Sequence, residues 1–243
     1  MAYSTAPIIV RGLPPVWGTP SPSPFVIKLL TWLRMAKIDH ELRPLASPPR
    51  STTKKIPYVE MPNGEIVSDS GRIIARLSTE RAIDLDAGLD DAARATARLL
   101  EATFEGHLYF AALYERFVTR EGWAFTRRDY FRAAPMAVRT FAPLIIRRGA
   151  IRNLYGQGTG RLARADVAEL ARRDLQAIAT TLGSRPYFLG AAPHTIDATA
   201  LGFLWAISSH PWESACRDAI ESHATLVAYV SRMREHVWSG FSG

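Results

Sequence analysis

The first eighty residues alternate between short β-branched runs and an apolar run at helical spacing. "PIIVRGL" and "IDHELRPL" are typical of strands, and "IPYVEM" and "EIVSD" form two more short runs around Pro62-Asn63-Gly64, a hairpin turn. "SDSGRIIARLSTE" opens with helix-capping residues. Between the first two strands, apolar residues recur every three or four positions: Phe25, Leu29, Leu30 and Leu33. The pattern predicts β-α-β followed by β-β-α, an α/β domain over residues 1–82.

Strand patterns stop near residue 90. "DDAARATARLLEATFEGHLYFAALYERFV", "RADVAELARRDLQAIATTLG", "TIDATALGFLWAISS" and "ATLVAYVSRMREHVW" are all helical in period. We therefore expect an all-helical domain over residues 91–243, joined by "DLDAGLD" at residues 84–90. The predicted fold class is a two-domain α+β protein with the α/β domain first.

Charge and composition narrow the partners. The net charge is +7, with 26 arginines and four lysines, but the arginine pairs are interleaved with Asp and Glu inside helical patterns, which is typical of solvated helix faces. We see no nucleic-acid motif and expect no nucleic-acid partner. There is no apolar run of membrane-spanning length, and the six histidines lack metal-ligand spacing. A single cysteine, Cys216, and no signal-peptide pattern favour the cytoplasm.

The turn "PSPSPF", residues 20–25, places two serines directly before the predicted helix. A helix N-terminus carries unpaired N–H groups and a partial positive charge, so the hydroxyl of Ser21 or Ser23 can cap the helix or donate to an anion held there. The natural anion in such an α/β domain is a thiolate. Lowering a thiol pKa of about 8.5 by two units takes about 2.7 kcal/mol, which a helix end and one charged hydrogen bond can supply. Helix capping and thiolate binding both remain open at this point.

Two later segments extend the same interpretation. Ile56-Pro57 leads into a strand, and a cis proline there would leave the backbone of Ile56 free for a ligand. Asp69 and Ser70 begin the next helix, where a carboxylate and a hydroxyl suit a ligand's ammonium and carboxylate groups. An ordinary strand start and an ordinary helix cap are the alternatives.

These motifs together resemble the glutathione transferase superfamily. "SPFVIKLLTWLRMAKIDHE" and "KKIPYV" followed by "DS" are similar to two of its segments, and "EGHLYFAALYERFV", "YGQGTGR" and "RPYFLGAAPHTIDATALGFL" resemble its metaxin and failed-axon-connections branch. The resemblance covers about residues 8 to 210. It implies a thioredoxin-like N-terminal domain followed by an all-helical glutathione transferase C-terminal domain.

The resemblance also implies roles for individual residues. Ser23, or its neighbour Ser21, would activate the thiol of glutathione. The tripeptide itself would be held by Lys55 at the glycyl carboxylate, by the backbone of Ile56 before cis-Pro57, and by Asp69 and Ser70 at the γ-glutamyl end. Asp197 is similar to the family's buried capping aspartate, with a role in folding. An electrophile pocket would be lined by Tyr109, Phe110, Leu113, Tyr114 and Phe117, although their spacing alone favours core positions.

The expected activity is transfer of glutathione, a co-substrate, to a hydrophobic electrophilic small molecule, without a metal, by a homodimer. The alternative is a metaxin-like binding or interaction module that keeps the fold without transferase activity. One departure from the family bears on this choice. About ten proline-rich residues, "ASPPRSTTKK", stand where family members have about twenty with a helix, so the glycyl end of the site is expected to be open or rebuilt.

Overall fold

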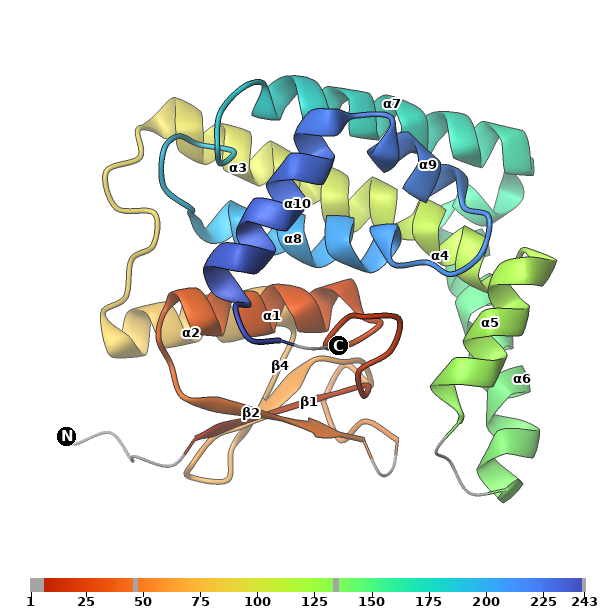
Figure 1. The fold of residues 1–243 in the computed structure, drawn as a ribbon. Coiled ribbons are helices and arrows are strands. Elements are labelled where there is room, and N and C mark those ends of the chain that lie inside the picture. The colour runs from red at the N-terminus through yellow and green to blue at the C-terminus, as the bar shows by residue number, and fades with distance from the viewer. Residues whose placement is uncertain (1–6, 46–47, 133–135, 242–243) are drawn as a thin grey trace.

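In Figure 1 a four-stranded sheet lies at the bottom, the two helices of the N-terminal part lie above it, and most of the later helices lie above those. The structure is a computed structural model that describes residues 7–45, 48–132 and 136–241. Strand order is β2-β1-β3-β4, with β1 parallel to β2 and antiparallel to β3, and β4 antiparallel to β3. The elements of this part are β1 (Ile8–Gly12), α1 (Pro24–Met35), β2 (His40–Pro44), β3 (Tyr58–Glu60), β4 (Ile66–Ser68) and α2 (Ser70–Arg81).

The predicted order of strands and helices is confirmed, and so is the hairpin turn. Gly64 adopts the left-handed conformation, with φ of 83°, and its N–H donates to the carbonyl of Met61 at 2.8 Å. Glycine suits this position because it has no Cβ to clash. No helix forms over residues 48–57 between β2 and β3, as the proline-rich composition predicts, and Ala46 and Ser47 lie outside the described residues.

The second part is helical throughout the residues that the structure describes, which confirms the predicted fold class. The predicted long helix over residues 90–118 forms two α-helices that are joined without a gap by a π-helical turn at Phe104–Leu108. None of the described helices is long and apolar enough to cross a membrane. The helices are α3 (Asp91–Thr103), α4 (Tyr109–Phe117), α5 (Arg120–Tyr130), α6 (Met136–Gln157), α7 (Arg164–Leu182), α8 (Thr195–Ser208), α9 (Ala215–Glu221) and α10 (Ala224–Val237).

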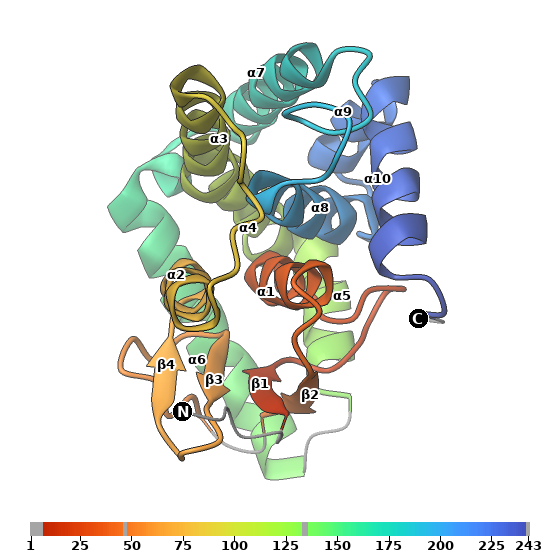
Figure 2. The ribbon, with the colours of Figure 1, turned by 90° about the vertical axis from the view of Figure 1, so that its left-hand side faces the viewer.

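Helix α1 lies between the sheet and the helical layer, and Figure 2 shows it directly beneath α8. All residues from Val26 to Leu33 are buried, because one side of α1 packs on the sheet and the other on α8. Helix α8 is itself buried from Ile196 to Ile207. The two parts therefore share one apolar core.

Two further fully buried residues lie in the helical part. Asp197 is fully buried and its carboxylate accepts the N–H groups of Phe188, at 3.1 Å, and His194, at 2.8 Å. It thus satisfies backbone donors at the start of α8, as its resemblance to a capping aspartate implies. Cys216 is also fully buried, and burial raises the pKa of its thiol well above the usual value.

The contact between α1 and α8 depends on Gly202. A Cβ at this position would lie 2.6 Å from the carbonyl oxygen of Pro24 and 2.8 Å from the backbone nitrogen of Lys28. Both atoms belong to backbone in the first turn or two of α1, so they cannot move aside as a side chain can. Close helix packing at the start of α1 therefore requires glycine here.

We predict that Gly202→Ala lowers the free energy of unfolding by about 2 kcal/mol or more, because the added methyl forces α8 away from α1. Gly149→Ala is the matched control: Gly149 lies inside α6, and a Cβ there meets nothing within 4 Å. That change should raise the stability by about 0.5–1 kcal/mol through helix propensity. Chemical denaturation measures both, and equal stabilities of the two variants would contradict the packing argument.

Candidate functional site

Three segments leave the sheet at the same end, and the strand register shows why. Tyr58 of β3 pairs with Arg11 of β1 on one side and with Ser68 of β4 on the other. The next residues outward are therefore Gly12, which leads to the serine turn, Pro57, and Asp69. A direct bond joins two of these segments, since the N–H of Asp69 donates to the carbonyl of Pro57 at 3.3 Å. The sheet thus places the cis-proline segment between the starts of α1 and α2.

Ser23 is the residue that precedes α1, and Pro24 is the first helical residue, as predicted. Its backbone is extended, with φ −91° and ψ 117°, and its half-buried hydroxyl makes no capping bond to the helix. Ser21 is fully buried, and its hydroxyl accepts the N–H of Ser23 at 3.4 Å. The two serines therefore differ in role: the Ser21 hydroxyl stabilises the turn, and the Ser23 hydroxyl remains available at the helix end.

The Ile56–Pro57 peptide bond is cis, which confirms the sequence prediction. Ile56 precedes the first paired residue of β3, so its N–H and C=O lie outside the ladder of the sheet. Lys55 is exposed, and its backbone N–H and C=O are both held by the Ser51 hydroxyl, at 3.0 Å and 2.7 Å. This small loop lies in the short segment for which the sequence predicts no helix.

At the start of α2, Asp69 is exposed and accepts the N–H of Arg72 at 3.1 Å, while Ser70 is buried. Asp69 has a positive φ of 79°, an uncommon conformation for a residue with a side chain. Its second carboxylate oxygen makes no bond to a described residue. The carboxylate thus caps the helix with one oxygen and leaves the other available.

The predicted pocket residues divide between the turn and the core. Tyr109 packs on Phe25, with ring centroids 5.0 Å apart, and so lies next to the serine turn. Phe110, Leu113 and Tyr114 are half-buried along the same helix, whereas Phe117 is buried against Trp123. A hollow of about 440 Å³ elsewhere, on the outer face of the sheet around Ile9, contains none of the predicted site residues.

The serine turn is anchored from the helical part by Arg116 of α4, a residue that sequence reasoning missed. Arg116 is only 7% exposed, and its Nη1 donates to the carbonyl of Pro22 at 2.9 Å. The peptide between Pro22 and Ser23 therefore has its C=O held by Arg116 and its N–H held by Ser21. Arg116 is therefore not on a solvated helix face, although nothing in the sequence pattern distinguishes it from the exposed arginines.

A chain of buried polar groups continues behind Arg116. Burial, together with the charges of Arg116 and Arg217, lowers the pKa of His210 well below its usual value, so this imidazole is neutral. Its Nε2 accepts from Arg116 at 3.0 Å, which assigns its proton to Nδ1, 3.4 Å from the Ser214 hydroxyl. Ser214 in turn donates to Glu115, whose pKa is raised by burial. The carboxylate nearest to Arg116 along this chain is thus two side chains away.

The surroundings of Arg116 are rich in donors and poor in acceptors. Within the described residues no carboxylate forms an ion pair with it, and its buried Nε has no hydrogen-bond partner. The guanidinium carbon lies 5.6 Å from the ring centre of Trp17 and 5.7 Å from that of Tyr130. The Tyr130 hydroxyl is also buried without a partner, and burial raises its pKa to about 12, so it stays protonated. A buried guanidinium without a counter-ion favours an anion nearby.

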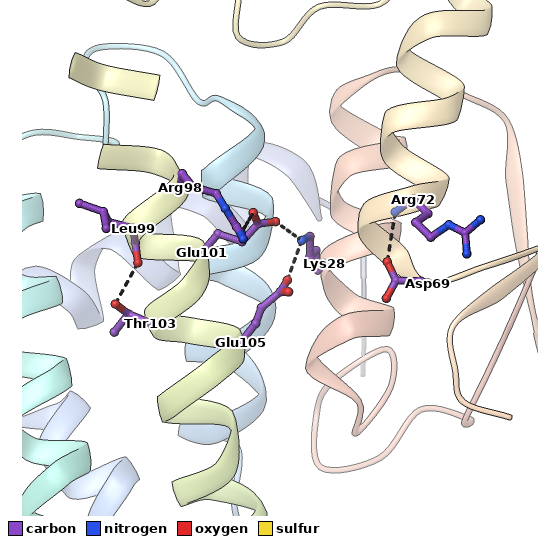
Figure 3. Close-up of polar contacts among 8 residues, drawn as sticks. All are labelled: Lys28, Asp69, Arg72, Arg98, Leu99, Glu101, Thr103 and Glu105. Carbon is purple, nitrogen blue, oxygen red and sulfur yellow. Dashed lines mark hydrogen bonds and ion pairs between the residues drawn. The ribbon is translucent and has the colours of Figure 1, made fainter. Parts of the chain in front are cut away.

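On the other side of α1, charge of the opposite sign gathers around Lys28 (Figure 3). The Nζ of Lys28, a residue only 1% exposed, lies 2.8 Å from Glu101 and 2.7 Å from Glu105. Burial alone would lower the pKa of Lys28, but the two carboxylates outweigh it and raise this pKa. Burial raises the pKa of Glu105 despite Lys28, with Glu101 and Asp69 adding to the rise. The negative charge of Asp69 therefore makes ionisation of Glu105 less favourable.

No group of three or more His, Cys, Asp or Glu side chains in the described ranges is arranged to hold a metal ion. The site offers instead a helix end with a free hydroxyl, an unpaired buried cation behind it, a cis-proline segment with an unpaired backbone, and a carboxylate at the start of α2. Such an arrangement can bind an anionic sulfur and an extended peptide-like ligand.

Comparison with known proteins places this geometry in a family. Residues 24–122 match the family model of the glutathione S-transferase N-terminal domain, and residues 171–233 match that of the glutathione S-transferase C-terminal domain. Isoprene-epoxide–glutathione S-transferase of Rhodococcus sp. (strain AD45) is 30% identical over 233 residues, which cover 94% of this chain and 98% of that protein.

Other relatives are longer than this chain. Failed axon connections of Drosophila melanogaster is 28% identical over 233 residues, 89% of this chain and 54% of that protein. Human metaxin-1 is 26% identical over 198 residues, 77% of this chain and 42% of that protein. This chain therefore spans about half the length of these two relatives.

Among solved structures, glutathione transferase GSTFuA3 from Phanerochaete chrysosporium has a TM-score of 0.67 at 13% identity, covering 99% of this chain and all of that one. Glutathione S-transferase III in its apo form has a TM-score of 0.59 at 17% identity and covers 98% and 99% of the two chains. These likenesses establish the fold. Together with the sequence matches, they show that the chain belongs to the glutathione transferase family, in the branch that includes Failed axon connections and the metaxins.

Proposed function

We propose that this protein binds glutathione as a thiolate at the N-terminus of α1 and transfers it to a hydrophobic electrophilic small molecule. The observation that carries the proposal is the available hydroxyl of Ser23 at a helix end whose turn is held by a buried, unpaired guanidinium. Two similar proteins support this choice of thiol. The Rhodococcus relative is a glutathione S-transferase by name, and a glutathione S-transferase of the same fold has been solved in complex with glutathione sulfonate. The electrophile of the Rhodococcus relative is an epoxide by its name, which belongs to the class proposed here.

In this proposal the tripeptide lies along the cis-proline segment. The unpaired backbone of Ile56 would bond to the cysteinyl residue, and Asp69 and Ser70 would hold the γ-glutamyl end. The ammonium there would also experience Glu105, whose charge is coupled to that of Asp69. Lys55, exposed on the short loop, would face the glycyl carboxylate.

The chemistry at the sulfur follows from the charges. The Ser23 hydroxyl donates to the thiolate, and the positive helix end and Arg116 favour the charged form over the thiol. The thiolate attacks the electrophilic carbon of a substrate that packs against Tyr109 and its neighbours. An opened epoxide oxygen then takes up a proton from solvent, whereas a halide departs as an anion with the bonding electron pair. The protein contributes orientation and thiol ionisation, with no covalent bond to its own side chains.

A second candidate function is a binding module that holds glutathione or a similar peptide without transfer. The specific observation in its favour is the short loop over residues 48–57, which supplies only the exposed Lys55 where the glycyl end would lie. Binding without turnover across a panel of epoxide and haloalkane electrophiles would favour this module over the enzyme. A homodimer is expected by the family resemblance for either function.

We predict that titration of glutathione into the protein at pH 7 releases close to one proton per site, measured by calorimetry in buffers of different ionisation enthalpy. Ser23→Ala should keep binding but lose most of the proton release, because one hydrogen bond to a charged group is worth about 1.5–3 kcal/mol, or one to two pKa units. Ser78→Ala, at the far end of α2, is the control and should match the wild type.

The titration also decides between the two serines. Ser21→Ala should weaken binding through a loosened turn while the remaining bound thiol still ionises. Loss of proton release in Ser21→Ala with retention in Ser23→Ala would reverse the roles assigned here. No heat and no thermal stabilisation by millimolar glutathione would refute both the transferase and the glutathione-binding module.

A further prediction concerns Arg116. At a separation on the order of 10 Å and an effective dielectric constant of about 20, one positive charge lowers the thiol pKa by about one unit. Arg116→Gln should therefore raise the pKa of bound glutathione, followed by thiolate absorbance against pH, by about one unit. Arg116→Lys keeps the charge and should raise this pKa less.

Arg147→Gln is the matched control for these variants. Arg147 is half-buried and, like Arg116, bonds a backbone carbonyl, that of Phe117 at 2.9 Å; it lies 5.0 Å over the ring of Trp123. It does not contact the serine turn, so its loss should leave the thiol pKa unchanged. An unchanged thiol pKa in folded, glutathione-bound Arg116→Gln would show that Arg116 has only a structural role.

A further inference from the structure

Helix α6 presents an apolar face that no part of the described chain covers. Eight of the twelve large hydrophobic side chains that are exposed among the described residues belong to this one helix. They include Phe141 at 67% exposure and Ile145 at 68%. Scattered single hydrophobic residues on a surface are ordinary, but this many on one helix are not.

The exposed side chains form a continuous stripe. Positions three and four apart lie on one face of a helix, and Pro143 and Leu154, on the opposite face, are buried. The exposed stripe thus extends along about four turns of α6. Its apolar members are Phe141, Leu144, Ile145, Ile151 and Tyr155.

The charge around this stripe is of one sign. Residues 130–165 hold seven arginines and no Asp, Glu or Lys. Two of them, Arg148 and Arg152, are exposed at positions inside the stripe, and no carboxylate of the described residues pairs with either. Elsewhere on the surface arginines do pair, as Arg172 does with Glu169 at 2.7 Å. The exposed face of α6 is therefore apolar, carries two unpaired arginines and has no acidic residue of its own.

We propose that α6 is a docking surface for a membrane with anionic lipids. A helix that carries large apolar side chains with interleaved arginines lies in the headgroup region of such a membrane, with the apolar groups inserted and the cations at the phosphates. Long arginine side chains can reach up to the phosphates while their stems remain among apolar neighbours. This proposal is independent of glutathione binding.

A second copy of the chain fits this surface less well. Pairing two identical α6 faces about a two-fold axis brings Arg148 and Arg152 toward their own counterparts, and the segment contains no acidic residue to compensate them. Anionic lipid supplies the missing negative charge without any change in the protein. Charge complementarity thus favours the lipid surface over self-pairing of α6.

The position of α6 gives the docking a consequence for the site. Helices α5 and α6 descend beside the end of the α/β part in Figure 1, and α5 contacts the serine-turn loop through a bond of 2.7 Å from Trp17 to Asp129. A membrane beneath α6 would therefore lie on the side of the molecule where α1 begins.

The test is co-sedimentation of the full chain with phosphatidylcholine vesicles that contain or lack one-third phosphatidylserine. We expect binding only to the anionic vesicles, weakened by salt as the charges are screened. The double variant Arg148→Gln/Arg152→Gln should bind about thirty-fold more weakly, at about 1 kcal/mol per arginine. Lys37→Glu makes the same change in net charge from an exposed position outside α6 and should retain nearly all binding.

The apolar contribution has its own matched pair. Phe141→Asn should weaken vesicle binding about tenfold or more, because an inserted aromatic ring is lost. Leu99→Asn removes a similar exposed side chain, 70% exposed on α3, and should have little effect. Equal loss in both variants would overturn the assignment to α6.

Two further outcomes would overturn the proposal as a whole. The first is no binding to anionic vesicles at low salt. The second is a wild-type dimer in light scattering that Phe141→Asn converts to a monomer, which would mean that a second copy covers this face. Folding of each variant is checked by its unfolding transition, and the three altered side chains on α6 are all exposed, so the fold should persist.

Discussion

The close contact between α1 and α8 is the constraint on which the rest of the structure depends. Helix α1 is buried on both sides, and Gly202 lets the backbone of α8 touch that of α1 at Pro24 and Lys28. The residue just before Pro24 is Ser23, so the geometry of the candidate site is set by contact between the two parts of the chain. A site built on a packed helix end keeps its orientation better than one on a free loop.

Charged side chains of both signs also connect the two parts of the chain. The helical part places Arg116 behind the serine turn, and it places Glu101 and Glu105 around Lys28 on the other side of α1. Burying these groups costs free energy that hydrogen bonds only partly offset, and Arg116 keeps an unpartnered Nε. A positive charge at the turn and negative charge near the start of α2 form a gradient that suits a ligand with an anionic sulfur and a cationic amine.

Local sequence patterns were sufficient for the elements of the α/β part, for most of the long helices and for part of the site. Apolar spacing, the Pro62-Asn63-Gly64 turn and the cap residues depend on neighbours in sequence, and Ser23, cis-Pro57 and Asp69 stand where these patterns put them. The polar chain from Arg116 through His210 to Glu115 could not be predicted. Its members are 94 and 99 residues from their partners, and Arg116 has the same helical setting in sequence as the exposed arginines. Helix α6 was equally hidden, because its apolar residues and arginines follow one another without a clear amphipathic period.

The segment that holds α5 and α6 connects the chemistry of the site to the surface of the molecule. Trp17, in the loop before the serine turn, donates to Asp129 of α5 and packs on Tyr130, whose ring also faces Arg116. A displacement of α5 would thus act on Arg116 through the aromatic rings around its guanidinium. Hydrophobic electrophiles concentrate in lipid, and a protein docked by α6 would take them up from the phase in which they are most abundant. The apolar, cationic surface of α6 and the candidate site are then linked through α5, which contacts the loop before the serine turn.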